Sequence, residues 1–102
     1  MTIFELLQET GLPCAYSHFK KKQEPPFLVY LGAGENSFGA DNTKYFREPQ
    51  YQVEYYFKKK DPAVEALIEE TILENEFLYE KSDDVYIENE GVFVIYYTVT
   101  AG

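Results

Sequence analysis

The stretch that decides the fold is Tyr51-Gln52-Val53-Glu54-Tyr55-Tyr56-Phe57, then Lys58-Lys59-Lys60-Asp61-Pro62, then Ala63-Val64-Glu65-Ala66-Leu67-Ile68-Glu69-Glu70. In its first part, aromatic and β-branched residues alternate with polar ones, which predicts a strand at about 50–58. In its last part, apolar residues recur at helical spacing, which predicts a helix at about 62–74. Asp61 suits the N-cap of that helix, and Pro62 suits its first turn, where no amide donor is needed.

The charge of the chain changes at the same junction. Residues 1–60 contain eight Lys/Arg and seven Asp/Glu, a net charge of +1. Residues 61–90 contain one Lys and eleven Asp/Glu, a net charge of −10, so this block accounts for the net −9 of the chain. So uneven a distribution bears on partners more than on fold. It argues against a nucleic-acid-binding protein, because phosphate contacts need Lys and Arg.

The other helix and strands follow from local signals. The spacing Thr2-x-x-Glu5 is that of a capping box and predicts a helix at about 3–10, which Gly11 ends. Glycines and polar residues at 32–37 predict a break in the chain after an apolar run. Runs rich in apolar and aromatic residues predict the remaining strands at about 14–19, 27–31, 43–47, 77–81 and 92–99.

The order of these elements predicts the fold class. A chain of 102 residues fits one domain with one core. A helix, four strands, a second helix and two more strands predict an α+β domain, with a mostly antiparallel β-sheet and two α-helices packed on one face. Pro49 has no amide donor, so we expect it at a sheet edge or a bulge. In the second helix, Val64, Leu67 and Ile68 are expected to be buried, and Asn75 is expected to form a left-handed stop.

The sequence also bears on the compartment. No apolar run approaches the roughly 20 residues that span a bilayer, so we expect no membrane contact. The start, Met1-Thr2-Ile3-Phe4-Glu5, lacks the basic and long apolar segments of a signal peptide. Cys14 is the single cysteine and cannot form an internal disulfide, which fits a reducing compartment. These features predict a protein that is cytosolic where it is made.

Three groups of residues were candidates for chemistry, and we expect none of them to form a site. The glycines at 32–39 lack the spacing of a dinucleotide or phosphate loop. Cys14 and His18 would share one face of a strand, but a nucleophile also needs an orienting group and an oxyanion site. The four acids at 83–90 do not match a calcium loop. The sequence therefore predicts a protein without catalytic residues, metal or cofactor, and not an enzyme.

The acidic helix violates local preferences. Glu65 and Glu69 are like charges at i,i+4, as are Glu70 and Glu74, and such pairs destabilise a helix by a few tenths of a kcal/mol. One interpretation is selection for a basic partner surface. The other is a solvated face that confers solubility. Both interpretations remain open at the level of sequence.

Residues 27–99, about three-quarters of the chain, contain an ordered set of short segments, namely Phe38-Gly39-Ala40-Asp41-Asn42, Tyr51-Gln52-Val53-Glu54-Tyr55-Tyr56, Lys59-Lys60-Asp61, the acids of 65–74, Phe77-Leu78-Tyr79-Glu80-Lys81, Tyr86-Ile87-Glu88 and Val94-Ile95-Tyr96-Tyr97. In this order they resemble a family of small tail proteins from tailed phages and prophages of Gram-positive bacteria. The resemblance is to the tail-terminator or tail-completion group, and the neighbouring head–tail joining proteins are of the same size and class.

The resemblance implies a non-enzymatic virion assembly protein. Such proteins cap the growing tail tube, often as a ring, and dock it to the head. The implied partners are other tail and head-completion proteins, together with further copies of the chain that form a ring on assembly. A monomer is the alternative state of the chain in isolation. The implied location is the host cytoplasm during assembly and the virion tail afterwards.

We expect the partner interface to include residues from two regions. The segment 32–42 is expected to be a flexible docking loop anchored by Phe38, and the lysines at 58–60 are expected to meet an acidic patch of a neighbour. Reversing Lys59 and Lys60 to Glu is expected to block assembly and leave the monomer folded. The full set of expected interface residues is Phe38, Asp41, Asn42, Tyr45, Lys58, Lys59, Lys60, Glu65 and Glu69.

Two alternatives belong to other functional classes. The −10 block has the charge of a DNA mimic that inhibits a host DNA-binding enzyme, although the lysines at 58–60 stand at its start. A host-encoded regulatory or antitoxin-like domain is the second of these alternatives, but the sequence contains no helix-turn-helix pattern.

Overall fold

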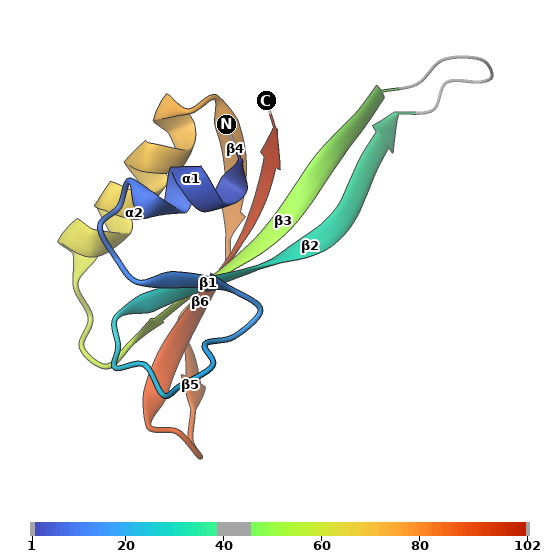
Figure 1. Cartoon of the computed structure of the whole chain (residues 1–102). Coiled ribbons are helices and arrows are strands. Elements are labelled where there is room, and N and C mark those ends of the chain that lie inside the picture. Colours follow the sequence, from blue (N-terminus) through green and yellow to red (C-terminus); the bar gives the residue numbers. More distant parts are fainter. Residues whose placement is uncertain (1, 39–45, 102) are drawn as a thin grey trace.

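Within residues 2–38 and 46–101, which the computed structural model describes, six strands form one mixed sheet with two helices against it (Figure 1). The strand order is β1-β2-β3-β6-β4, with β5 also beside β6, and every pair is antiparallel except β1 with β2. The predicted α+β class with a mostly antiparallel sheet is therefore confirmed. The elements are α1 (Ile3–Gln8), β1 (Cys14–Tyr16), β2 (Phe27–Phe38), β3 (Phe46–Phe57), α2 (Pro62–Glu74), β4 (Phe77–Lys81), β5 (Val85–Ile87) and β6 (Val92–Ala101).

The capping box predicted for α1 is present. Glu5 N donates to Thr2 Oγ1 over 3.1 Å, and Thr2 N donates to Glu5 Oε1 over 2.8 Å. The helix ends at Gln8, two residues before the predicted boundary, and the hydroxyl of Thr10 donates to Leu7 O over 2.7 Å where the chain turns away. Gly11 then adopts a φ of +79°, a conformation that favours glycine.

The start of α2 follows the predicted signals, but its end differs. The side chain of Asp61 accepts a hydrogen bond from Ala63 N over 3.1 Å, which fits its expected role as N-cap. At the other end Asn75 is the C-cap with a φ of −96°, and Glu76 takes the left-handed conformation with a φ of +65°. The expectation that Asn75 is left-handed was wrong, because its side chain instead donates to Thr71 O over 2.9 Å.

The predicted break at 32–37 was wrong, because β2 continues through it to Phe38. Gly32 pairs with Tyr51 and Glu35 pairs with Pro49, so β2 holds one extra residue at a β-bulge. Gly34 in this bulge has a φ of +89°. Pro49 therefore lies at a bulge, as its missing amide donor predicted.

The strands predicted at 43–47 and 50–58 are one continuous strand, β3, from Phe46 to Phe57, and residues 43–45 lie outside the described part. The first strand is shorter than the predicted 14–19. It ends at Tyr16 because Ser17 has a φ of +66° and leaves the ladder after donating to Tyr30 O over 2.9 Å.

A two-stranded ribbon, here named the arm, extends beyond the rest of the sheet (Figure 1). It consists of Glu35–Phe38 of β2 and Phe46–Pro49 of β3. Pairing of β1 with β2 stops at Tyr30, and pairing of β6 with β3 begins only at Gln50. Among the described residues, the arm therefore has no third strand on either side.

The opposite edge of the sheet is divided between two short strands. β4 pairs with residues 97–101 of β6, and β5 pairs with residues 92–94. Ser82 lies between them, donates from its amide to Tyr96 O over 2.9 Å, and accepts from Tyr96 N at its hydroxyl over 2.9 Å. A serine side chain thus supplies the hydrogen bond that a continuous strand would have made.

The core lies between the helices and one face of the sheet. α1 contacts β1 and α2 contacts β4, so the helices cover opposite margins of this face and also contact each other. Asn75 Nδ2 donates to Glu9 Oε1 over 3.1 Å between their ends. The buried core side chains are Ile3, Leu6, Leu7, Leu28, Val53, Tyr55, Phe57, Ile68, Ile72, Ile95, Tyr97 and Val99.

The buried face of α2 includes Ile68, as predicted, but not Leu67. Leu67 is 41% exposed, whereas Glu65 is only 5% exposed. A charged residue of α2 is therefore buried, whereas a leucine that the hydropathy pattern predicted to be buried is exposed. Neither helix of the described chain is long and apolar enough to cross a membrane.

Candidate functional site

A cluster of charges around the buried Glu65 joins α2 to the sheet edge. It is here named the Glu65 cluster and consists of Lys60, Glu65, Glu69, Lys81 and Tyr97. Lys81 Nζ lies 3.0 Å from Glu65 Oε1 and 2.7 Å from Glu69 Oε2, so one cation is shared by both carboxylates. Lys60 Nζ lies 2.7 Å from Glu65 Oε2. The hydroxyl of Tyr97 donates to Glu69 Oε2 over 2.8 Å.

The fold brings these residues together from separate elements. Lys60 stands just before α2, Glu65 and Glu69 lie one turn apart on α2, and Lys81 ends β4. Register places Lys81 directly across from Tyr97 on β6. The cluster therefore ties the helix to two strands, and Lys60 also reaches Asp84 Oδ1 at 3.1 Å.

Burial and pairing act in opposite directions on the Glu65 carboxyl. Burial would raise its pKa, but hydrogen bonds and charges from Lys60 and Lys81 outweigh this, and the net pKa of Glu65 is lowered. Glu65 is therefore ionised at neutral pH although its side chain is 6% exposed. The pKa of Lys60 is raised, first by its hydrogen bond to Glu65.

Tyrosines around the cluster are held in their neutral form. Burial raises the pKa of Tyr97 well above its ordinary value, and the hydrogen bond to Glu69 adds to this. Burial, with the nearby charges of Glu65 and Asp61, raises the pKa of Tyr55 to about 12. Both hydroxyls stay protonated, and that of Tyr97 can serve as a stable donor.

The cluster changes the interpretation of the acidic helix. Glu65 and Glu69 do repel each other at i,i+4, but the cations that compensate them belong to the same chain. For this pair, neither a basic partner nor a solvated face is needed. Glu70 and Glu74, the second like-charged pair, remain exposed.

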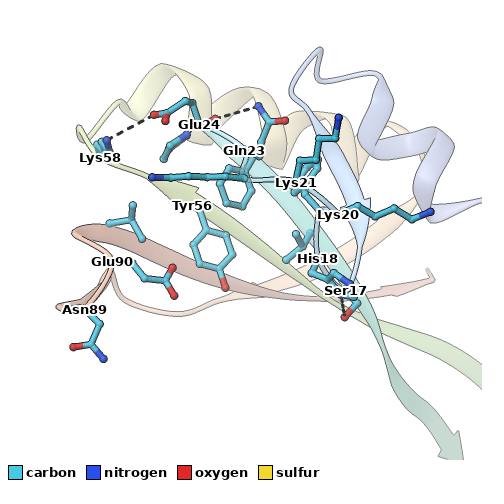
Figure 2. A pocket seen from close by; sticks show the side chains of 16 residues that line it. Ser17, His18, Lys20, Lys21, Gln23, Glu24, Tyr56, Lys58, Asn89 and Glu90 are labelled. Atoms are coloured by element: carbon cyan, nitrogen blue, oxygen red, sulfur yellow. Dashed lines mark hydrogen bonds and ion pairs between the residues drawn. The ribbon is translucent and has the colours of Figure 1, made fainter.

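A groove on the sheet face opposite the helices is the second candidate (Figure 2). Its volume is about 620 Å³. Four lysines, three of them from the run at 20–22, lie with two carboxylates around an aromatic floor. Figure 2 shows Tyr56 between Glu90 on one side and Lys21 on the other. We name it the basic groove; its charged and aromatic lining residues are Phe19, Lys20, Lys21, Lys22, Glu24, Phe27, Tyr56, Lys58 and Glu90.

The floor of the basic groove is formed by packed rings. Phe27 stacks on Tyr56 with centroids 5.0 Å apart, and Phe19 meets Phe27 edge-on at 5.2 Å. The hydroxyl of Tyr56 donates to Glu54 Oε1 over 2.7 Å, and Gln52 Nε2 donates to Glu54 Oε2 over 2.7 Å. The buried carboxylate thus fixes the ring that lies at the centre of the floor.

The sequence pattern does not indicate the basic groove, because a polar run such as Lys20–Lys22 between two strand-like segments is typical of an exposed connection. The available signal was the pair of aromatic residues, Phe19 and Phe27, at the ends of that connection. The connection folds back over the sheet, and this return brings the lysines beside Tyr56, about 35 positions away in sequence.

The expected pairing of Cys14 with His18 on one strand is wrong, because β1 ends at Tyr16 and His18 lies beyond the turn. His18 Nδ1 lies 3.1 Å from Ser17 Oγ. Burial raises the pKa of the Cys14 thiol, the opposite of what an activated nucleophile needs. No group of three or more His, Cys, Asp or Glu within the described ranges is placed to hold a metal ion.

The expected interface residues fall into three places. The backbone of Phe38 ends β2 in the arm, whereas Asp41, Asn42 and Tyr45 lie outside the described residues. Lys58 lines the basic groove and lies 3.8 Å from Glu24, and Lys59 is exposed. The remaining three, Lys60, Glu65 and Glu69, form the Glu65 cluster.

This placement changes one expectation. Reversing Lys60 to Glu would put a third carboxylate beside Glu65 and remove one of its cations, so the double reversal of Lys59 and Lys60 would not leave the fold intact. Lys59 alone is the suitable position for testing an interface.

Comparisons with known proteins identify no relative. The chain matches no family model, no curated protein and no solved structure with which it was compared. The arm, the Glu65 cluster and the basic groove are thus the features on which a function has to rest.

Proposed function

We propose that this chain is a non-enzymatic assembly protein of a tailed phage or prophage, acting at tail termination, tail completion or head–tail joining. Its partners are other tail and head-completion proteins and further copies of the chain in a ring. It acts in the host cytoplasm during assembly and then stays in the virion tail. The resemblance of residues 27–99 to phage tail proteins suggests this class of protein, and the arm is the observation that carries the proposal.

The arm has the properties of a segment that needs a neighbour. A two-stranded ribbon is marginally stable in water without a third strand or a packed face. Beyond Gln50, β6 pairs with no residue of the arm, and β1 stops at Tyr30. Unpaired strand edges are exposed pairing surfaces that proteins usually shorten or cover. A neighbouring subunit that covers the arm would account for its length.

The two sides of the sheet suit a subunit with several neighbours. One side presents the basic groove, and the other presents α2 with the exposed carboxylates of Glu70 and Glu74. A subunit in a ring meets each neighbour through a different surface, and opposite charges on those surfaces fix the orientation.

The DNA-mimic alternative receives less support from the structure. A mimic presents its carboxylates outward, free of cations, at phosphate-like intervals. Glu65 is buried, and both Glu65 and Glu69 are paired with Lys81 at 3.0 Å or less. These two acids are therefore unavailable as phosphate substitutes.

The test is deletion of the gene from an inducible prophage, followed by electron microscopy of the lysate and mass spectrometry of purified virions. Loss of a tail terminator is expected to give tails of uncontrolled length beside unattached heads. Loss of a head–tail joining protein is expected to give normal tails beside unattached heads. Normal infectious virions from the deletion strain, or virions that never contain the chain, would contradict the proposal.

A further inference from the structure

We propose that the basic groove binds the outward face of α2 from a second copy of this chain, as an acidic helix in a basic, aromatic groove. This contact would join the subunits of the ring and to that extent rests on the proposed function. It identifies the occupant of a groove that the protein's own side chains leave open.

The groove gathers most of the positive charge that the described chain leaves uncompensated. Lys60 and Lys81 are engaged in the Glu65 cluster. The exposed lysines at 20–22 form no ion pair with any described carboxylate, and Lys58 reaches Glu24 only at 3.8 Å between two exposed side chains. In a chain of net charge −9, this concentration of cations is complementary to an acidic partner surface.

The outward face of α2 has the complementary chemistry. Leu67 and Leu73 are each three residues from Glu70, and Glu74 is four residues from it, so all four lie on one side of the helix. Leu67 is 41% exposed and Leu73 is 51% exposed, and both carboxylates are exposed as well. Two leucines can rest on an aromatic floor while the two carboxylates meet lysines at the rim. This is the recurring arrangement of an amphipathic helix in a groove.

The positions of the two surfaces determine the kind of assembly. Tyr56 and Phe27, on the groove floor, point away from the sheet face that carries α2, because side chains alternate along a strand. Groove and helix are thus different surfaces on opposite sides of one molecule. A contact between them is head-to-tail, and such contacts build a closed ring when the rotation between subunits permits closure.

The experiment uses the purified full chain and two charge-reversal variants. K21E/K22E makes the groove acidic, and E70K/E74K makes the helix face basic. Sedimentation velocity over a range of concentrations measures self-association, and circular dichroism checks that each variant is folded. E80K/D83K is the matched control, because it changes net charge as much as E70K/E74K at acids outside α2.

Wild-type chain is expected to self-associate, with weaker association as salt concentration rises. Each reversal variant alone is expected to lose affinity for itself roughly tenfold or more, because like charges then face each other. An equimolar mixture of the two variants is expected to associate again, since the acidic groove of one now fits the basic helix of the other. The control is expected to associate as wild type does.

Several outcomes would overturn the inference. One is a wild-type chain that stays monomeric at all concentrations, and another is a mixture of the two variants that fails to associate. Binding of a single-stranded oligonucleotide that K21E/K22E abolishes, with no effect of E70K/E74K on self-association, would assign the groove to nucleic acid instead. None of these results affects the deletion experiment, so failure of this contact and failure of the assembly function can be told apart.

Discussion

The Glu65 cluster and the arm belong to the same sheet but are stabilised in different ways. In the cluster, four charged groups and a buried tyrosine hold α2, β4 and β6 together at distances of 3.0 Å or less. In the arm, two strands pair with each other past the ends of β1 and β6. The Glu65 cluster is stabilised by many contacts within one chain, whereas the arm is stabilised mainly by the hydrogen bonds of a single β-ladder.

This difference indicates which part of the molecule is available for assembly with other subunits. Breaking a contact in the cluster leaves a buried charge or cavity, so it affects the stability of the whole domain. Breaking a contact in the arm affects a segment that can open locally without unfolding the core. Mutations should therefore separate global stability from local order, and those with the largest expected effect lie in the cluster.

The largest effect is expected for Tyr97→Ala. Tyr97 is fully buried in the core and donates to Glu69, so truncation leaves a cavity and removes a hydrogen bond. We expect a loss of about 3–5 kcal/mol in the free energy of unfolding, measured by urea denaturation. Tyr97→Phe keeps the ring and should cost about 1.5 kcal/mol. Equal costs for the two variants would show that packing contributes nothing at this position.

Lys81→Met is expected to cost about 2–3 kcal/mol, because Glu65 and Glu69 lose the cation they share. The estimate lies below that for a fully buried pair, since Lys81 is 33% exposed and Lys60 still compensates Glu65. Lys59→Met, at an exposed position, is the control and should change stability by less than about 0.5 kcal/mol. Adding Glu65→Gln to Lys81→Met should recover part of the loss. A double variant less stable than Lys81→Met would contradict the role given to Glu65.

A smaller effect on the free energy of unfolding is expected when the pH is lowered. Because the pKa of Glu65 is lowered in the folded state from an ordinary value of 4.5, its contribution to stability is present above pH 4.5. That contribution is lost as pH falls through the lowered pKa. The difference in unfolding free energy between wild type and Glu65→Gln should therefore narrow steadily below pH 4.5. A difference that stays constant from pH 7 to pH 3 would show that the charge of Glu65 is not what stabilises the fold.

The smallest effect on global stability is expected in the strand that leads into the arm. Gly34 has a φ of +89°, so Gly34→Ala strains the bulge by about 1–2 kcal/mol although no atom lies within 4 Å of the added Cβ. Because the arm can open locally and so relieve this strain, hydrogen exchange of the arm amides should become faster, while the global unfolding free energy changes by less than about 0.5 kcal/mol. Gly32→Ala has the same open surroundings and no positive φ, and it should change neither. A large global loss in Gly34→Ala would mean that the arm and the core unfold together.

Local chemistry in the sequence predicted the parts of the fold that depend on neighbouring residues. The capping box of Thr2 and Glu5 and the N-cap at Asp61 both depend on residues within three positions, and both predicted helix starts are correct. The failure at 32–37 has an equally local origin. Glycine indicates a break when taken alone, but here Gly34 supplies the positive φ of a bulge that lets β2 continue.

The candidate sites were less predictable, because each depends on residues distant in sequence. Hydropathy placed Leu67 inward, whereas the position of Lys81 on β4 makes an inward Glu65 favourable. That position follows from strand register, which the sequence alone does not specify. In the same way, Lys21 and Tyr56 become neighbours only when the connection after β1 folds back over the sheet.

The interruption of the sheet edge at Ser82 makes the two edges of the sheet unequal as sites for strand addition. A side chain that completes the ladder at Tyr96 keeps β4 and β5 short, so that edge offers little length for a strand from another molecule. The outer edge of β2 is unpaired from Leu31 to Phe38 within the described chain, and β2 continues through its bulge at 32–35. A strand from another molecule could therefore be added at the β2 edge but not at the edge formed by β4 and β5. A structure that grows by strand addition would end at the edge formed by β4 and β5.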